Sequence, residues 1–99
     1  MFTPSHHHRR SIAAALRLAL TLVDDLDRVP VPLRTLPAGP DLTLRVTRLC
    51  RLMRSILSRD AAAPIFLSLP STPTPGEIAV PTIHALRVCE GWLKQYGAV

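Results

Sequence analysis

Five arginines recur at short spacing in the middle of the chain, and residues of this type at this spacing could bind phosphate. The guanidinium group stays charged at physiological pH and donates hydrogen bonds in a fork that matches two phosphate oxygens. No acidic residue interrupts the segment between Leu42 and Asp60. The pattern therefore predicts a surface for an anionic partner. The five residues are Arg45, Arg48, Arg51, Arg54 and Arg59.

The residues between the arginines predict an amphipathic helix over about 42–60, with Asp41 as its N-cap. Three-residue spacing turns successive arginines by about 60° around such a helix, which gives a broad positive ridge. Arg45 lies on the edge of this ridge. The apolar arc on the other side of the helix consists of Leu42, Val46, Leu49, Cys50, Leu52, Met53, Ile56 and Leu57.

The ridge favours the phosphate backbone of a duplex. It has no interleaved aromatic residues, so stacking on single-stranded bases is not indicated. A-form RNA hides its base edges in a deep major groove and is recognised largely by its shape and its phosphates, which suits an arginine surface. Three other interpretations stay open: a solvated polar face in an arginine-biased chain, an acidic protein partner, and a membrane surface that accepts a basic amphipathic helix.

Two further helices are expected, over about 5–28 and 82–97. Thr82 is expected as the N-cap of the later helix. The proline-rich segments 29–40 and 61–81 are expected to be connectors, the first of them extended. The apolar side of the first helix comprises Ile12, Ala15, Leu16, Ala19, Leu20, Leu22, Val23 and Leu26, and that of the third comprises Ile83, Leu86, Cys89, Trp92, Leu93 and Tyr96.

The charges of the first helix are placed against its macrodipole. Basic residues lie near its start and the acidic residues Asp24, Asp25 and Asp27 near its end, where the dipole is negative. The three aspartates are expected to be a solvated helix end rather than an acidic site. An antiparallel or symmetry-related helix end would compensate their charge.

These elements predict an all-α fold, with residues 1–99 as a single helical domain. The two long amphipathic helices would pair as a hairpin, with a shorter third helix beside them. A hairpin alone would leave parts of both apolar arcs in contact with water, whereas two hairpins paired as a four-helix bundle would bury them and double the arginine ridge. We therefore expect a homodimer.

Composition and motifs argue against an enzyme. A chain of 99 residues has little room for both a stable core and a shaped pocket. Its formal net charge of +5 favours an anionic partner. It carries no glycine-rich phosphate loop and no nucleophile elbow. The adjacent side chains of His6, His7 and His8 do not converge on a metal ion, and no cofactor is expected. Cys50 and Cys89 fall on apolar faces and are expected to be buried, reduced thiols.

Two segments have alternative interpretations as a binding motif or a targeting signal that another protein recognises. The spacing of Arg34, Pro37 and Pro40 fits a ligand of an SH3-type domain, although in a proline-rich chain a rigid, turn-forming linker is the preferred interpretation. The basic and apolar N-terminal stretch is interpreted as a soluble helix, with a mitochondrial presequence as the alternative. No transmembrane segment is expected. A cytoplasmic location is expected, with nuclear and mitochondrial locations as alternatives.

Two short segments resemble the nodaviral suppressor of RNA silencing. Residues 51–57, Arg-Leu-Met-Arg-Ser-Ile-Leu, resemble the basic-helix stretch of that family, and residues 81–83, Pro-Thr-Ile, resemble the start of its third helix. The resemblance implies a four-helix-bundle dimer that lies along double-stranded RNA and shields it from the host dicing nuclease. It matches Arg51 to a backbone-contacting arginine of the family. Face geometry adds Arg48 and Arg54.

The sequence thus predicts a non-enzymatic protein that holds duplex RNA by its phosphates through Arg48, Arg51 and Arg54, flanked by Arg45 and Arg59. Two alternatives belong to other classes. One is a small regulatory module that contacts a protein through the segment 34–40 or through Trp92, Leu93 and Tyr96. The other is a peripheral membrane or mitochondrial protein with an amphipathic helix.

Overall fold

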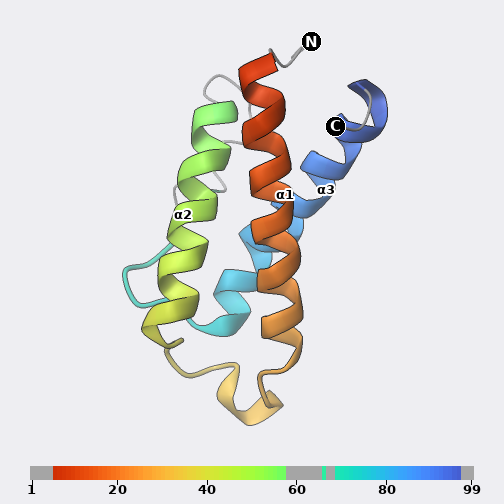
Figure 1. Cartoon of the computed structure of the whole chain (residues 1–99). Coiled ribbons are helices and arrows are strands. Elements are labelled where there is room, and N and C mark those ends of the chain that lie inside the picture. The colour runs from red at the N-terminus through yellow and green to blue at the C-terminus, as the bar shows by residue number, and fades with distance from the viewer. Residues whose placement is uncertain (1–5, 58–65, 67–68, 97–99) are drawn as a thin grey trace.

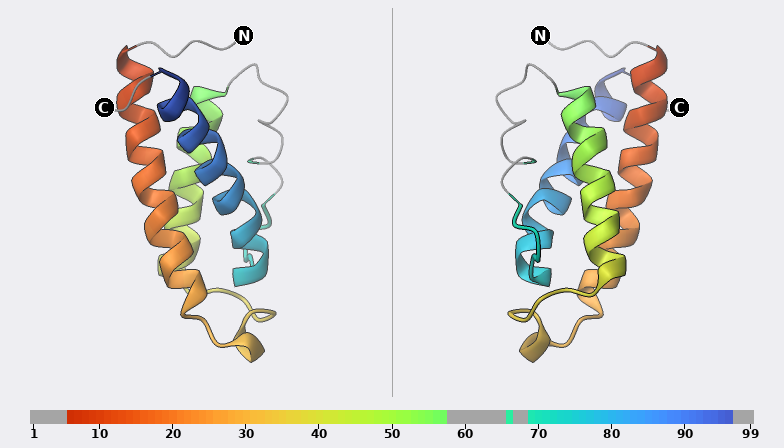
Figure 2. Two further views of the ribbon diagram at one scale, coloured as in Figure 1. Left: turned by 90° about the vertical axis from the view of Figure 1, so that its right-hand side faces the viewer. Right: turned by 90° about the vertical axis from the view of Figure 1, so that its left-hand side faces the viewer.

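The protein is a three-helix arrangement in the computed structural model, which describes residues 6–57, 66 and 69–96. Helices α1 and α2 run antiparallel, side by side, and α3 packs obliquely against one side of this pair (Figure 1). The other side of the pair is open among the described residues (Figure 2). No strand occurs in these ranges, so the expected all-α class is confirmed for them. The elements are α1 (His6–Asp27), a 3-10 turn η1 (Val31–Leu33), α2 (Pro40–Ile56) and α3 (Pro75–Tyr96).

The three helices turn their apolar faces toward one another and form a single buried cluster. Residues at three- and four-residue spacing supply it, as expected for amphipathic helices. Between α2 and α3, the described side chains of Leu57 and Phe66 also join the cluster. Phe66 packs on the ring of His84 with 5.7 Å between the ring centroids. The fully buried helix members include Ile12, Ala19, Leu22, Val46, Leu49, Met53, Ile78, Ala85 and Cys89.

Helix α1 begins and ends within one residue of the expected bounds of 5–28. The prediction of its apolar side is confirmed with one exception: Leu20 is 48% exposed. At about 100° per residue Leu20 lies a quarter turn from the fully buried Ala19, at the edge of the buried face. The polar residues Arg17, Thr21 and Asp24 are exposed, as expected.

Helix α2 begins two residues earlier than expected. Gly39 is its N-cap and Pro40 is its first residue, a position at which the fixed φ of proline suits a helix. The expectation of Asp41 as N-cap is therefore wrong: Asp41 lies in the first turn. The helix ends at Ile56, where the N–H of Leu57 donates to the carbonyl of Met53 at 2.8 Å. The expected last residues 58–60 lie outside the described residues.

Helix α3 begins at Pro75 and not near Thr82, which corrects both the expected start and the expected cap. The actual cap is the Thr74 side chain: its Oγ1 accepts from the Glu77 N–H at 3.2 Å, and Glu77 Oε1 accepts from the Thr74 N–H at 3.0 Å. This reciprocal pair is a capping box, with proline at the first helical position. With 22 residues, α3 equals α1 and exceeds the 17 of α2, so the third helix is not the shorter one.

Pro81 lies inside α3, where sequence reasoning placed a connector. An interior proline removes one backbone hydrogen bond and costs about 3 kcal/mol. Pro81 and Thr82 are both buried, and the Thr82 hydroxyl donates to the carbonyl of Ile78 at 2.7 Å. Burial of this turn offsets the loss. The actual core face passes through Ile78 and Thr82, which leaves Ile83, an expected core residue, 42% exposed.

The connector between α1 and α2 is folded rather than extended. It contains η1, in which the N–H of Leu33 donates to the carbonyl of Pro30 at 2.9 Å. The N–H of Ala38 donates to the carbonyl of Pro73 at 2.8 Å, which ties the connector to the segment before α3. The expectation of an extended connector is wrong, because proline at the second position is compatible with a 3-10 turn.

Within the described part of the chain, none of the helices combines the length and the apolar character that a membrane crossing requires.

Candidate nucleic-acid interface

Three of the predicted arginines lie exposed along one side of α2. Arg48, Arg51 and Arg54 are all exposed, while Leu49 and Met53 between them are fully buried. The three-residue spacing rotates the guanidinium groups around the helix, so Arg48 and Arg51 face outward and Arg54 turns toward the segment before α3. None of the three forms an ion pair with a described carboxylate. Their charge is available to an external anion.

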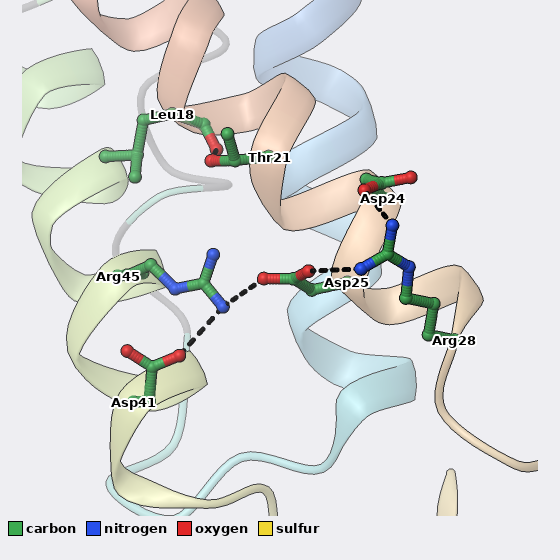
Figure 3. A network of polar contacts seen from close by, with 7 residues as sticks. All are labelled: Leu18, Thr21, Asp24, Asp25, Arg28, Asp41 and Arg45. Atoms are coloured by element: carbon green, nitrogen blue, oxygen red, sulfur yellow. Dashed lines mark hydrogen bonds and ion pairs between the residues drawn. The ribbon is translucent and has the colours of Figure 1, made fainter.

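Arg45, the fourth predicted residue, is held inside the protein. Its Nη2 donates to Asp25 Oδ2 of α1 at 2.5 Å and to Asp41 Oδ2 at 2.8 Å (Figure 3). Its side chain is only 20% exposed, against 38% for that of Asp25. Burial works against its charged form, but the hydrogen bond to Asp25 and the charge of Asp41 outweigh that effect, so the pKa of Arg45 is raised. Arg45 joins α2 to α1 and is not part of the exposed row.

The expected compensation at the end of α1 is therefore confirmed, and it comes from an antiparallel neighbour in the same chain. Arg28 also contributes: its guanidinium lies 3.1 Å from Asp24 and 4.0 Å from Asp25. Arg59, the fifth predicted residue, lies outside the described residues. The structure thus brings Arg48, Arg51 and Arg54 together on the exposed side of α2 and separates Arg45 from them.

Arg54 borders a small cavity of about 230 Å³ beneath the segment before α3. Cys50 is one of the residues that line it. Burial raises the pKa of Cys50, and the nearby charge of Arg54 opposes this shift only in part. The thiol is therefore neutral at physiological pH and is not an activated nucleophile. The described residues that line the cavity are Thr47, Cys50, Arg54, Phe66, Leu69, Pro70 and Ser71.

A second, apolar hollow lies beside the first part of α2, and sequence reasoning missed it. Its volume is about 630 Å³, and Leu44, which is 58% exposed, stands at its edge. The available signal was Leu44 itself, an apolar residue on the arginine side of the helix. The lining residues are Pro37, Ala38, Pro40, Thr43, Leu44, Thr47, Ser71 and Thr72.

The segment 34–40 does not have the conformation of an SH3 ligand. Such ligands are continuous polyproline II helices. Here Arg34 is helical, with φ −71° and ψ −15°, and Pro40 is the first residue of α2. The Arg34 Nε donates to the carbonyl of Val29 at 3.1 Å. In this structure the motif is part of the fold, and the linker interpretation fits it.

Other groups that could do chemistry do not gather into a site. Among the described residues, no three histidine, cysteine or acidic side chains lie close enough to hold a metal ion. Cys50 and Cys89 are both free and buried, as expected. The Cys89 thiol contacts Met53 Sδ at 3.8 Å, and burial raises the pKa of Cys89 to about 12. These thiols are part of the core.

Fold and surface together define a small helical protein with a basic, outward-facing helix and no assembled reaction centre among the described residues. Comparison of the chain with protein-family models, with curated proteins and with solved structures gives no match.

Proposed function

We propose that this protein binds duplex RNA by its phosphates, without catalysing a reaction, and acts by covering the duplex. The observation that supports this proposal is the contrast along α2. Arg45 is neutralised by two carboxylates, whereas Arg48, Arg51 and Arg54 are exposed and have no ion pair with a described carboxylate. Exposed arginines on a rigid helix bind phosphate backbones irrespective of sequence. Arg59 would extend this surface.

The resemblance of residues 51–57 to the nodaviral suppressors adds a biological setting to this proposal. A protein that lies along a duplex excludes nucleases from it by occlusion alone. The proposed role is therefore suppression of RNA silencing during a virus–host interaction, with Arg51 as the residue that the resemblance matches.

The homodimer stays a prediction, but α3 changes which apolar side chains a second copy would bury. Within one chain α3 already covers the apolar faces of α1 and α2. A second copy would instead cover apolar side chains that α3 leaves exposed, such as Leu20, Val80 and Ile83. Light scattering at micromolar concentration tests the prediction: a dimer mass is expected, and a folded monomer would contradict it.

An electrophoretic shift titration tests RNA binding. Double-stranded RNA, duplex DNA and single strands are compared at two salt concentrations, with wild type, Arg51→Glu and Arg87→Glu. Arg87 is exposed on α3 and receives the same change of charge. Duplex RNA binding should fall steeply with salt. It should be lost in Arg51→Glu and retained in Arg87→Glu. Binding that survives Arg51→Glu unchanged would contradict the proposal.

A protein-interaction module is the second candidate function, and the hollow at Leu44 favours it. Exposed apolar side chains beside a hollow are typical of docking surfaces. Trp92 and Leu93 fit this role less well, because both are half-buried against the core. This candidate predicts no duplex affinity at physiological salt and a loss of partner binding in Leu44→Asp.

A further inference from the structure

We infer that the basic surface has a second row of arginines on α1, Arg10 and Arg17, and that the two rows contact the two phosphate strands of one duplex. This inference rests on the proposed function and names residues and a geometry that α2 alone does not supply. It follows from the orientation of α1, the orientation of α2, the register between them and the distribution of carboxylates.

The orientation of α1 is fixed by Asp25, which reaches α2 by its contact with Arg45 (Figure 3). Leu18, half-buried, also lies on the side toward α2. At about 100° per residue, Arg10 and Arg17 lie between this side and the fully exposed side of the helix. Both are exposed. They therefore project from the open side of the α1–α2 pair, the side that α3 does not cover (Figure 1).

The orientation of α2 is fixed by the same contact. Arg45 points toward α1, and each step of three residues turns the next arginine about 60° away from α1. Arg48 is the first to face outward, and Arg51 follows it. The open side of the helix pair thus carries Arg48 from α2 and Arg17 and Arg10 from α1, while Arg51, turned about 120° from α1, lies at the outer edge of that side.

The register between the helices places Arg17 beside the last turns of α2, whereas Arg10 lies farther toward the start of α1, beyond the level of Ile56. Because α1 and α2 are antiparallel, each step forward from Arg45 along α2 corresponds to one step back from Asp25 along α1. Arg17 is therefore level with Met53, between Arg51 and Arg54. Packed helices lie about 8–10 Å apart, so the rows are separated by at least that distance.

Acidic residues are absent from the part of α1 that carries this second row. No acidic residue precedes Asp24 in the sequence. The described carboxylates apart from Glu90 lie in the terminal turns at the opposite end of the bundle: Asp24, Asp25 and Asp27 of α1, Asp41 of α2 and Glu77 of α3. Their charge is partly neutralised there by Arg28 and Arg45. The potential on the open side therefore increases from the acidic end toward the start of α1.

Two parallel rows fit a duplex better than a single strand. A duplex presents two phosphate strands on either side of a groove, and a surface wide enough to span the groove contacts both. A single strand follows one row and leaves the other without a phosphate. The structure therefore assigns a preference for duplexes to Arg10 and Arg17 and general phosphate affinity to Arg48 and Arg51.

The test compares Arg17→Ala with Arg51→Ala and with the matched control Arg87→Ala. Arg87 is also an exposed mid-helix arginine, but it lies on α3, which packs on the other side of the helix pair. Affinity for a double-stranded RNA and for a single strand is measured by fluorescence anisotropy from about 50 to 200 mM salt. Loss of one phosphate contact should lower duplex affinity about eightfold at 0.1 M salt and reduce the salt slope by about one unit. Arg17→Lys should restore most of the affinity.

Arg17→Ala should show this loss for the duplex and less than a twofold change for the single strand, whereas Arg51→Ala should weaken both. Arg87→Ala should change neither by more than about twofold. An unchanged duplex slope in Arg17→Ala, beside a reduced slope in Arg51→Ala, would overturn the second row and leave the proposed function standing. Equal losses in Arg17→Ala and Arg87→Ala would also overturn it. A wild-type chain without duplex affinity would instead contradict the proposed function itself.

Discussion

Arg45 of α2 and Asp25 of α1 form an ion pair of 2.5 Å across the helix interface, and Asp41 accepts from the same nitrogen at 2.8 Å. Among the described residues, this is the ion pair that joins two helices. It lies where α1 ends, so it places a cation beside carboxylates that oppose the helix macrodipole. The Nε of Arg45 is buried without a hydrogen-bond partner, which shows how far the side chain is withdrawn from solvent.

Asp25→Ala is expected to destabilise the protein by about 1–2 kcal/mol. Exposed pairs contribute about 0–1 kcal/mol and broken buried pairs cost about 3–5 kcal/mol, and this half-buried pair lies between them. Urea denaturation measures the change. Asp24→Ala is the matched control, because Asp24 is more exposed and its described ion pair is with Arg28, the residue directly after α1. Equal effects of the two variants would show that the link between helices contributes nothing of its own.

The first two helices could be predicted because their apolar residues recur at the helical period over four turns or more. The role of Arg45 could not be predicted from the sequence. Its spacing from Arg48 and Arg51 makes it a member of the same series, and only the packing of α1 against α2 brings it to Asp25, twenty residues earlier in the chain. The same register determines that Arg17 lies beside the predicted row. Sequence periodicity assigns faces to each helix but does not say which face meets which neighbour.

Thr74→Ala is expected to lower the free energy of unfolding by about 1 kcal/mol, because it removes the N-cap of α3. The loss leaves the Glu77 N–H without the Thr74 oxygen. Chemical denaturation followed by circular dichroism measures it. Thr72→Ala is the control, since Thr72 is exposed and precedes the cap. A Thr74→Ala variant as stable as Thr72→Ala would contradict the observed start of α3.

The start of α3 was predicted wrongly because Pro81 was treated as a helix boundary. Proline is unfavourable in a helix interior, yet one lost hydrogen bond is outweighed when the surrounding turn is buried. The sequence Thr74-Pro75-Gly76-Glu77 carries the complete signal of a capping box with proline at the first position. The capping box predicts a helix start at Pro75, whereas Pro81 predicts a later start. The burial of Ile78 and Thr82 in the core favours the earlier start.

Leu49→Ala is expected to destabilise the protein by about 2–5 kcal/mol, whereas Leu44→Ala should change stability by less than about 1 kcal/mol. Both leucines belong to α2, but Leu49 is fully buried and Leu44 is 58% exposed. Removal of buried methyl groups costs their transfer free energy and leaves a cavity. Thermal and urea denaturation compare the two variants. A larger effect of Leu44→Ala would indicate that Leu44 is covered in solution, as a dimer or a docked partner would require.

Cys89 should make the protein less stable above pH 9. Burial raises the pKa of its thiol from the ordinary value of 9.0 to about 12. Between these values the unfolded chain loses the thiol proton and the folded protein keeps it. The free energy of unfolding therefore falls with rising pH by up to about 1.4 kcal/mol per unit, and the stabilisation is fully present below pH 9.

Cys89→Ala removes the titrating group and should flatten this pH dependence, whatever its effect on absolute stability at neutral pH. The measurement is urea denaturation of wild type and variant at several values from pH 8 to 10.5, compared as slopes. Both chains share the same lysine and tyrosine and the buried thiol of Cys50, so those groups contribute equally to the two slopes. Identical slopes would mean that the Cys89 thiol ionises as readily in the folded protein as in the unfolded chain. That result would be incompatible with its position against Met53 in the centre of the helix bundle.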